Sequence, residues 1–234
     1  MENTKCVLVT GASQGIGKAI SLSLAKDHSC KVFALSRNES ALNELASASS
    51  NIIPIVCDLT SKSERKVALN KINSISSHLD GLINNAGFLV NGSLPNLDEE
   101  DIRKIFEVNY FSAALLIQEC LGLLKKAKSS HIVNIGSMGG FQGSQKFNGL
   151  SVYSSSKAAL ASLSECLAVE LAEFGISSNC LNLGAVQTEM LEEAFPGYRA
   201  PLDAKSMGKY IAKFALEGHE TYNGQSLPVS FSAP

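Results

Sequence analysis

A tyrosine and a lysine four positions apart could together hold and move a proton. Tyr153 and Lys157 lie in a segment of helical period, where side chains at i and i+4 share one face of a helix. A free phenol has a pKa near ~10, and a neighbouring ammonium stabilises the phenolate and lowers that pKa. The pair therefore predicts a general acid–base for a substrate oxygen. The pattern is weak by itself, because Tyr-x-x-x-Lys also occurs on solvated helices.

Two polar residues earlier in the chain could complete such a site. Ser137 follows an apolar run at 132–135, which places it just past the carboxyl end of a strand, the edge where open α/β sheets bind ligands. Its hydroxyl could orient a substrate oxygen, or it only starts a turn. Asn109, between Val108 and Tyr110, either joins this site or is a buried amide bonded to backbone.

A glycine-rich segment, Gly11-Ala12-Ser13-Gln14-Gly15-Ile16-Gly17, separates the first apolar run from a helical pattern. Glycines at a strand-to-helix turn let the backbone approach a pyrophosphate, and the helix N-terminus offers free N–H groups, so the segment predicts a dinucleotide site. Two alternatives are a turn without a ligand and a hydrolase nucleophile elbow, since residues 11–15 also satisfy G-x-S-x-G. The elbow interpretation is disfavoured, because Ser13 follows the first strand, before any sheet is built.

The cofactor is predicted from the end of the second apolar run. About 20 residues beyond a glycine loop, an Asp or Glu binds the ribose 2′-hydroxyl of NAD. Here the run ends in Leu35-Ser36-Arg37-Asn38, with a cation in place of the acid. A guanidinium pairs with a 2′-phosphate, so NADP(H) is expected. The alternative is that Arg37 is an ordinary solvated residue at a helix start.

Seven apolar runs alternate with segments of helical period. They cover residues 7–9, 32–35, 52–57, 82–83, 132–135, 180–183 and, weakly, 227–231. Continuous runs are typical of parallel strands covered on both faces, so the chain is expected to be an α/β protein with a doubly wound parallel sheet. Helix starts are expected at Asn38 or Ser40, at Thr60 or Ser61, and at Asp98. The longest helix is expected over 151–174, closed by Gly175.

Composition limits the partners. The 234 residues, 45% hydrophobic and 18% charged, fit one domain over 1–234. A formal charge of -2 gives no basic field for nucleic acid or anionic lipid, which favours a small-molecule partner. No apolar stretch approaches the ~18 residues of a membrane span, and no charged leader precedes the first run, so a cytoplasmic protein is expected. The six cysteines are scattered without metal-ligand spacing, so buried thiols and no metal are predicted.

Taken in order, these motifs over about residues 5–190 resemble the short-chain dehydrogenase/reductase family. The spacing G-x-x-x-G-x-G, Asn84-Asn85-Ala86-Gly87, and the set Asn109, Ser137, Tyr153 and Lys157 carry the resemblance. It implies that Tyr153 and Ser137 act on the substrate oxygen, that Lys157 also holds the nicotinamide ribose, and that Asn109 serves a water-mediated proton relay. The implied cofactor-binding residues are Gly11, Ser13, Gln14, Gly15, Ile16, Gly17, Ser36, Arg37, Asp58, Leu59, Asn85, Ala86, Gly87, Tyr153, Lys157, Gly184, Val186 and Thr188.

The resemblance also implies an architecture and an activity. We expect a three-layer, Rossmann-type sandwich of about seven strands in the order 3-2-1-4-5-6-7, assembled as a homodimer or homotetramer. The expected activity is NADP(H)-dependent reduction of a carbonyl to an alcohol, or the reverse. The alternative is a nucleotide-binding regulator or scaffold without turnover. By resemblance Asp58 contacts the adenine amino group and Thr188 the nicotinamide carboxamide, although Asp58 could instead cap the helix that begins near Thr60.

Three places depart from the family pattern. Leu183-Gly184 stands where relatives carry Pro-Gly, which puts the rigidity of that turn in doubt. The insert over 138–150 is expected to shape the substrate mouth, and a short substrate lid is expected at about 188–203. Residues of the mouth suggest an apolar lining, or else ordinary core: Met138, Phe141, Phe147, Met190 and Phe195.

Overall fold

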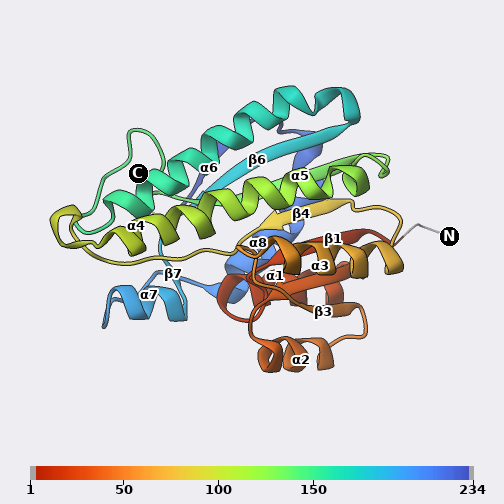
Figure 1. The fold of residues 1–234 in the computed structure, drawn as a ribbon, viewed down its shortest axis with the longest axis horizontal. Helices are drawn as coiled ribbons and strands as arrows, with labels where there is room; N and C mark the ends of the chain where they lie inside the picture. Colours follow the sequence, from red (N-terminus) through yellow and green to blue (C-terminus); the bar gives the residue numbers. More distant parts are fainter. Residues whose placement is uncertain (1–3, 232–234) are drawn as a thin grey trace.

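Seven parallel strands form the central sheet in the order β3-β2-β1-β4-β5-β6-β9 (Figure 1). The computed structural model describes residues 4–231. The strands are β1 (Cys6–Thr10), β2 (Lys31–Ser36), β3 (Ile52–Val56), β4 (Gly81–Asn84), β5 (Ser130–Ser137), β6 (Ile176–Leu183) and β9 (Ser226–Val229). The predicted strand order is confirmed, and the weakest apolar run supplies the edge strand β9, paired in parallel with β6.

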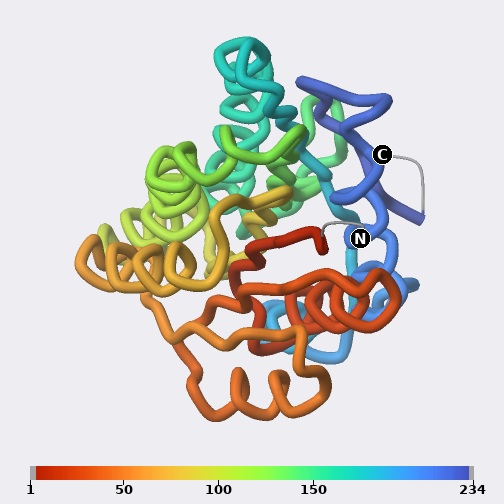
Figure 2. Tube along the Cα trace, turned by 90° about the vertical axis from the view of Figure 1, so that its right-hand side faces the viewer, coloured from red at the N-terminus to blue at the C-terminus, as the bar shows by residue number. Residues whose placement is uncertain are grey.

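The sheet is covered on both faces, which explains the continuous apolar runs. In β1, Val7 and Val9 pack into one hydrophobic cluster, whereas Cys6 and Leu8 pack into the other, because successive side chains of a strand point to opposite faces. One cluster includes α1 (Gly15–Lys26), α2 (Glu39–Ser47) and α8 (Ala204–Glu217). The other includes α3 (Lys62–Ile75) and α5 (Ser112–Leu124), so the chain folds into three layers (Figure 2).

Side-chain caps set the helix starts that the sequence predicted. Asn38 accepts a hydrogen bond from the N–H of Ala41 to start α2, and Ser61 accepts one from Glu64 to start α3. Asp98 caps α4 (Glu99–Phe106) in the same way. The longest helix, α6 (Ser151–Glu170), ends before 174; residues 172–174 tighten into a 3₁₀ turn that Gly175 closes at φ 69°.

Several short elements were not predicted. A π-helical turn, η2 (Glu107–Phe111), joins α4 to α5, and 3₁₀ turns occupy η1 (Leu94–Asn96) and η4 (Gly218–Glu220). Strands β7 (Val186–Gln187) and β8 (Leu202–Asp203) pair as a separate two-stranded sheet, with α7 (Glu189–Ala194) between them. This pairing fixes both ends of the segment where a lid was expected.

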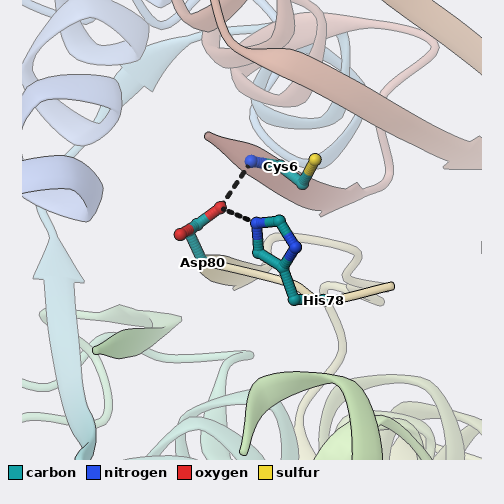
Figure 3. A group of neighbouring side chains, drawn as sticks. All are labelled: Cys6, His78 and Asp80. Atoms are coloured by element: carbon teal, nitrogen blue, oxygen red, sulfur yellow. Dashed lines mark hydrogen bonds and ion pairs between the residues drawn. The ribbon is translucent and has the colours of Figure 1, made fainter. Parts of the chain in front are cut away.

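Five of the six cysteines are buried, as expected, and Cys166 is exposed. Among residues 4–231, no helix is long and apolar enough to cross a bilayer. One group with metal-ligand chemistry, Cys6, His78 and Asp80, gathers at the amino ends of β1 and β4, on the opposite edge from the carboxyl ends (Figure 3). Asp80 Oδ2 already accepts the Cys6 N–H at 2.7 Å and lies 3.3 Å from His78 Nε2, so we assign this group the structural role of holding the start of β1.

Candidate active site

A cleft of about 830 Å³ opens at the carboxyl ends of the central strands. β2 and β3 lie on one side of β1, whereas β4, the strand that follows β3 in the chain, lies on its other side. The strand order therefore reverses between β1 and β4, and open α/β sheets bind ligands at such a switch point. Residues at or just beyond five strand ends line the cleft: Ser36 (β2), Asp58 (β3), Asn85 (β4), Ser137 (β5) and Gly184 (β6).

The structure brings nearly all the predicted site residues to this cleft. Those that line it are Gly11, Ser13, Gln14, Gly15, Ile16, Ser36, Arg37, Asp58, Leu59, Asn85, Ala86, Gly87, Ser137, Tyr153, Lys157, Gly184, Val186 and Thr188. Gly17 and Asn109 are the two predicted residues that do not line it. Gly17 instead allows close packing, because a Cβ there would overlap the carbonyl oxygen of Gly11.

The glycine loop is suited to an anion. Gly11 and Gly15 have φ values of 63° and 52°, a left-handed conformation that glycine adopts without strain. Gln14 is the N-cap residue of α1, but its side chain makes no capping bond, and the first turn of α1 carries no acid. The N–H groups of that turn therefore lack a side-chain acceptor and can bind a phosphate.

The end of the cleft where an adenine is predicted to bind is organised around Asp58. Its Oδ1 accepts hydrogen bonds from the N–H of Thr60 at 2.9 Å and from Thr60 Oγ1 at 2.8 Å. Burial opposes ionisation of Asp58, but these bonds and the charge of Arg37 outweigh it and lower the pKa of the carboxyl. Asp58 thus shapes the turn before α3, while Ser61 is the cap, so the capping alternative for Asp58 does not hold.

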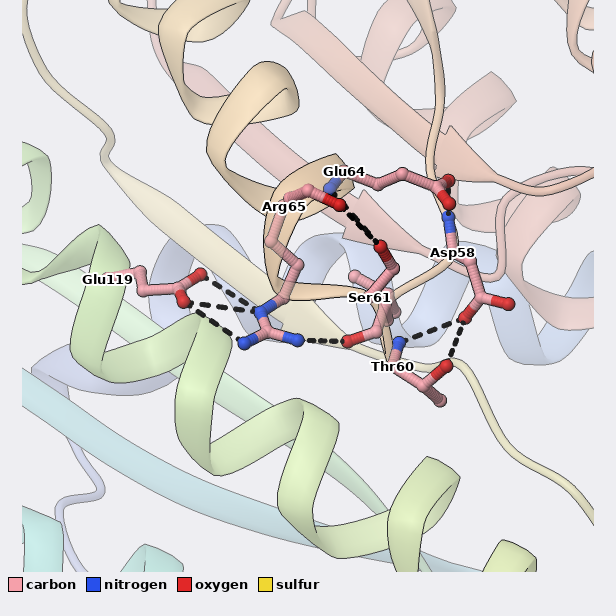
Figure 4. A network of polar contacts seen from close by, with 8 residues as sticks. Asp58, Thr60, Ser61, Glu64, Arg65 and Glu119 are labelled. Atoms are coloured by element: carbon pink, nitrogen blue, oxygen red, sulfur yellow. Dashed lines mark hydrogen bonds and ion pairs between the residues drawn. The ribbon is translucent and has the colours of Figure 1, made fainter.

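A buried ion pair supports this end from behind (Figure 4). Arg65, only 2% exposed, lies 3.0 Å from Glu119 of α5 and donates through Nη1 to the carbonyl oxygen of Leu59 at 2.7 Å. Glu64 accepts the N–H of Asp58 at 2.8 Å. Side chains from α3 and α5 therefore fix the backbone of the two cleft residues Asp58 and Leu59.

The predicted proton-transfer residues meet at the junction of β5 and α6. Tyr153 and Ser137 both line the cleft, and Lys157 Nζ donates to the Ile135 carbonyl oxygen at 2.8 Å and lies 5.9 Å from the centre of the Tyr153 ring. Burial raises the pKa of Tyr153 to about 12, although the Ser137 hydroxyl acts in the opposite direction. Burial also lowers the pKa of Lys157 to about 8. The expected lowering of the tyrosine pKa is therefore wrong for this structure, because desolvation of the phenol dominates.

Asn109 sits behind this group, in the π-helical turn. Its Oδ1 accepts the Phe88 N–H at 2.7 Å, and its Nδ2 donates to the Phe88 carbonyl and to Ser156 Oγ, both at 2.9 Å. The side chain is buried and fully bonded. It fixes the segment that follows Gly87 against α6, and π-helical turns of this kind often occur at functional sites.

The predicted substrate half of the cleft lies between the 138–150 insert and the 188–203 segment. Met138, Phe147, Met190 and Phe195 line it as expected, whereas Phe141 does not. Asn91 Nδ2 donates to the Ala194 carbonyl at 2.8 Å, and Gly92 N–H donates to the Gly149 carbonyl at 3.0 Å. These two bonds tie the loop after β4 to both walls of the mouth.

The missing proline at 183 is compensated by hydrogen bonds. The carbonyl of Leu183 accepts the Met138 N–H at 2.8 Å, and Gly184 N–H donates to Val229 at 2.8 Å. The turn after β6 is thus held by neighbouring strands on both sides. A Cβ on Gly184 would come within 2.5 Å of Ser230 Oγ, so a larger residue here would displace the Ser230 side chain.

Sequence reasoning missed Glu189. Its carboxylate oxygen lies 3.4 Å from the position a Cβ on Gly15 would occupy, beside the uncapped start of α1. Glu189 also borders a wider, more open groove of about 1080 Å³ beside α1, which shares Gly15 and Thr188 with the cleft but contains none of the proton-transfer residues. No local pattern relates residue 189 to residue 15, so only the folded chain reveals this contact.

Comparison with known proteins agrees with this geometry. The family model described as short chain dehydrogenase matches residues 5–199. An uncharacterised oxidoreductase of Staphylococcus epidermidis is 32% identical over 208 residues, 88% of this chain and 89% of its own. L-xylulose reductase of Caenorhabditis elegans is 37% identical over 191 residues, 80% of this chain and 73% of its own. The (S)-benzoin-forming benzil reductase of Saccharomyces cerevisiae is 32% identical, and the match covers 95% of both chains.

A solved structure shares the fold. The 3-ketoacyl-(acyl-carrier-protein) reductase of Brucella melitensis, complexed with NADH, matches with a TM-score of 0.87 and 22% identity, over 97% of this chain and 96% of its own. The chain belongs to the short-chain dehydrogenase family, whose members are oxidoreductases that bind a nicotinamide cofactor. Membership sets aside the hydrolase interpretation of Gly11–Gly15.

Proposed function

We propose that the chain is an NADP(H)-dependent oxidoreductase that reduces a carbonyl to an alcohol, or catalyses the reverse reaction. The observation that carries this proposal is that Tyr153, Ser137 and Lys157 line the same cleft as the glycine loop, with Lys157 bonded to the Ile135 carbonyl beside them. A nicotinamide cofactor held in this cleft would supply the hydride for the substrate carbon. Ser137, Tyr153, Lys157 and Asn109 are the proposed catalytic residues.

Each side chain has a distinct task. The phenol of Tyr153 donates its proton to the carbonyl oxygen, and Ser137 orients that oxygen by hydrogen bonding. With a pKa raised to about 12, Tyr153 stays protonated at neutral pH, which suits the direction of reduction. The Lys157 ammonium stabilises the phenolate left behind and holds the ribose. Asn109, whose side chain is bonded to Phe88 and Ser156, is the proposed member of a water-mediated proton relay.

The cofactor preference rests on Arg37. It is exposed, lines the adenine end of the cleft, and has no Asp or Glu beside it at the end of β2. A guanidinium there can pair with the 2′-phosphate of NADP(H). Gln14 in the glycine loop is uncharged, so Arg37 is the cation that we assign to the 2′-phosphate. The Brucella reductase was solved with NADH, which has no 2′-phosphate.

The domain, the assembly and the cellular location follow from the same resemblance and from the cysteines. We propose one domain over 1–234, with 188–203 acting as a substrate lid, and assembly as a homodimer or homotetramer. Five buried thiols fit a reducing compartment, in keeping with a cytoplasmic location. The partner is a small carbonyl or alcohol compound, with no role for nucleic acid or membrane.

The deciding experiment measures NADPH oxidation with a broad carbonyl panel, in wild type and in Tyr153→Phe. Loss of the proton donor should reduce kcat about 100- to 10,000-fold while NADPH affinity stays within a few-fold. Tyr222→Phe, remote from the cleft, is the matched control. Retained turnover in Tyr153→Phe would overturn the assignment of the proton donor. Cofactor binding without turnover on any carbonyl would favour the alternative, a nucleotide-binding regulator or scaffold.

A further inference from the structure

The substrate half of the cleft is lined by apolar side chains on both walls. Met138, Phe147 and Leu150 come from the insert, and Met190, Phe195 and Tyr198 come from the lid. Phe147 is 54% exposed and Tyr198 49% exposed, so two aromatic surfaces face solvent at the mouth. Exposed aromatic surface inside a cleft is available to a ligand, since its burial on binding is favourable.

The charges of the cleft lie away from these walls. Its charged lining residues are Arg37 and Asp58 at the adenine end, and Lys157 and Glu189 near its middle. Lys157 already donates to Ile135. Within the described part of the chain, the substrate half thus presents no cation to a carboxylate or phosphate.

Neither of the two basic residues in the wall segments is available to a substrate in the cleft. Lys146 is the one basic residue in 138–150, and its ammonium bonds the Gly139 carbonyl at 2.9 Å, the Phe141 carbonyl at 2.6 Å and Ser144 Oγ at 2.9 Å. Arg199, the one basic residue in 188–203, is not a lining residue. Of the four acids in that segment, Glu189, Glu192, Glu193 and Asp203, Glu189 lines the cleft. An anionic substrate would therefore meet repulsion.

Polar groups for a polyhydroxylated substrate are also scarce. Besides Ser137 and Tyr153, the polar lining residues of 138–150 are Ser144 and Gln145, and those of 188–203 are Thr188, Glu189 and Tyr198. Thr188 Oγ1 already accepts the Leu191 N–H. The Ser144 hydroxyl is engaged by Met138, Phe141 and Lys146. Hydroxyl groups buried without partners lose hydrogen bonds to water, so a sugar would bind poorly.

We propose that the substrate is an uncharged ketone whose carbonyl carries apolar substituents of aryl size. This inference rests on the proposed function, because it describes what the same Tyr153 and Ser137 would act upon. A hydride adds to the carbonyl carbon, Tyr153 protonates the oxygen, and the products are the neutral alcohol and the oxidised nicotinamide. The apolar substituents lie between the insert and the lid.

Three matched probes separate charge from size. With NADPH and the full chain, kcat/KM is measured for 1-phenyl-1,2-propanedione, for phenylglyoxylate, which replaces acetyl by carboxylate, and for 2,3-butanedione, which replaces phenyl by methyl. Each value is divided by the rate of borohydride reduction, to remove intrinsic carbonyl reactivity. The aryl diketone should exceed each of the others at least about a hundredfold. L-xylulose and acetoacetyl-CoA, as representative sugar and thioester probes, should also fall at least that far below it.

Variants test the walls themselves. Phe147→Ala should lower kcat/KM for the aryl diketone about tenfold without changing the Kd for NADPH. Phe174→Ala, also partly exposed but beside the amino end of β6, should change neither value. Gln145→Lys places an ammonium in the substrate half and should raise kcat/KM for phenylglyoxylate relative to that for 2,3-butanedione.

The outcomes are distinguishable. Equal efficiency with phenylglyoxylate overturns the requirement for an uncharged substrate, and equal efficiency with 2,3-butanedione overturns the requirement for an aryl group. Efficient reduction of L-xylulose or acetoacetyl-CoA leaves the proposed function intact and rejects this substrate class. Absence of NADPH oxidation with every probe, despite cofactor binding, rejects the proposed function and this inference with it.

Discussion

The Nζ atom of Lys157 donates a hydrogen bond to the carbonyl oxygen of Ile135 at 2.8 Å, two residues before Ser137. This bond joins α6 to β5 at the point where the proton-transfer group assembles. Since the ammonium is buried, its proton is held less tightly than in water, and the pKa of Lys157 falls to about 8. The charge on this residue therefore changes within an accessible pH range.

Cofactor affinity should fall as the pH rises through about 8. Lys157 is charged below that pH and neutral above it, and the charged form is the one proposed to hold the ribose. Fluorescence titration of NADPH between pH 6.5 and 9.5 measures the effect. Lys157→Met should bind NADPH weakly at every pH, so that its Kd does not vary with pH. Lys66→Met, which changes an exposed residue of α3, should keep the wild-type dependence of the Kd on pH. A wild-type Kd that does not vary with pH would remove the ribose role.

Arg37→Ala should reduce the preference for NADPH over NADH about tenfold to a hundredfold. A hydrogen bond to a charged group contributes roughly 1.5–3 kcal/mol, and NADH has no 2′-phosphate to lose. Dissociation constants for both cofactors decide the matter, at one stated ionic strength because salt screens this exposed pair. Arg103→Ala is the control, as its guanidinium pairs with Glu99 on the surface. An unchanged ratio means that Arg37 is only a solvated residue at the start of α2.

Glu189→Gln should tighten both cofactors several-fold and leave their ratio unchanged. The carboxylate lies against Gly15, where the pyrophosphate is expected, so removing its charge relieves repulsion for NADH and NADPH alike. This pattern differs from that of Arg37, which acts on one cofactor. Glu193→Gln, on the same short helix but outside the cleft, should have little effect. Unchanged or weaker binding in Glu189→Gln contradicts the proposed repulsion.

Breaking the buried ion pair should affect stability and binding in separable ways. Arg65→Leu leaves Glu119 and the Leu59 carbonyl without their partner, and should lower the free energy of unfolding by about 3 kcal/mol. Adding Glu119→Leu should recover much of that loss, since no unpaired charge remains. Cofactor affinity should stay reduced in the double variant, because the Leu59 carbonyl is still unsupported. Urea unfolding and NADPH titration of wild type, of each single variant and of the double variant complete the double-mutant cycle.

The free energy of unfolding should fall in mild acid because of the buried His131. Its ring is buried between Asn179 and the Ala215 carbonyl, and burial lowers its pKa from 6.5 to about 4. The unfolded chain therefore takes up a proton first as the pH falls below 6.5. Stability should be lost progressively down to pH 4, by about 3 kcal/mol in total. His131→Gln should show a shallower loss in urea unfolding than wild type, whereas His28→Gln should match wild type.

The strands and helix starts were predictable because local chemistry decides them. A continuous apolar run such as 7–9 needs cover on both faces, and Asn38 or Ser61 can cap a helix with its own side chain. The cleft residues were predictable because each follows a strand end, and parallel strands bring those ends to one edge of the sheet.

Other features depend on contacts between distant segments. The pairing of β7 with β8 involves two residues from each strand, too few to leave a periodic signal. The pKa of Tyr153 depends on burial, which the neighbouring Lys157 does not reveal. Asn109 bonds Phe88 and Ser156, residues 21 and 47 positions away, so its buried position follows only from the packed chain.

The Lys146 ammonium bonds three oxygens that all belong to residues 139–144, within its own loop. Hydrogen bonds from this loop to the rest of the protein are few, chiefly from Gly92 N–H to the Gly149 carbonyl and from Met138 N–H to the Leu183 carbonyl, whereas Gly139 and Gly140 pack closely against α6. A segment held mainly by its own hydrogen bonds can be replaced as a unit. Residues 141–148, which leave these contacts in place, are accordingly the segment to exchange in loop grafting and library design, in which new cleft walls can be tried while the rest of the chain is unchanged.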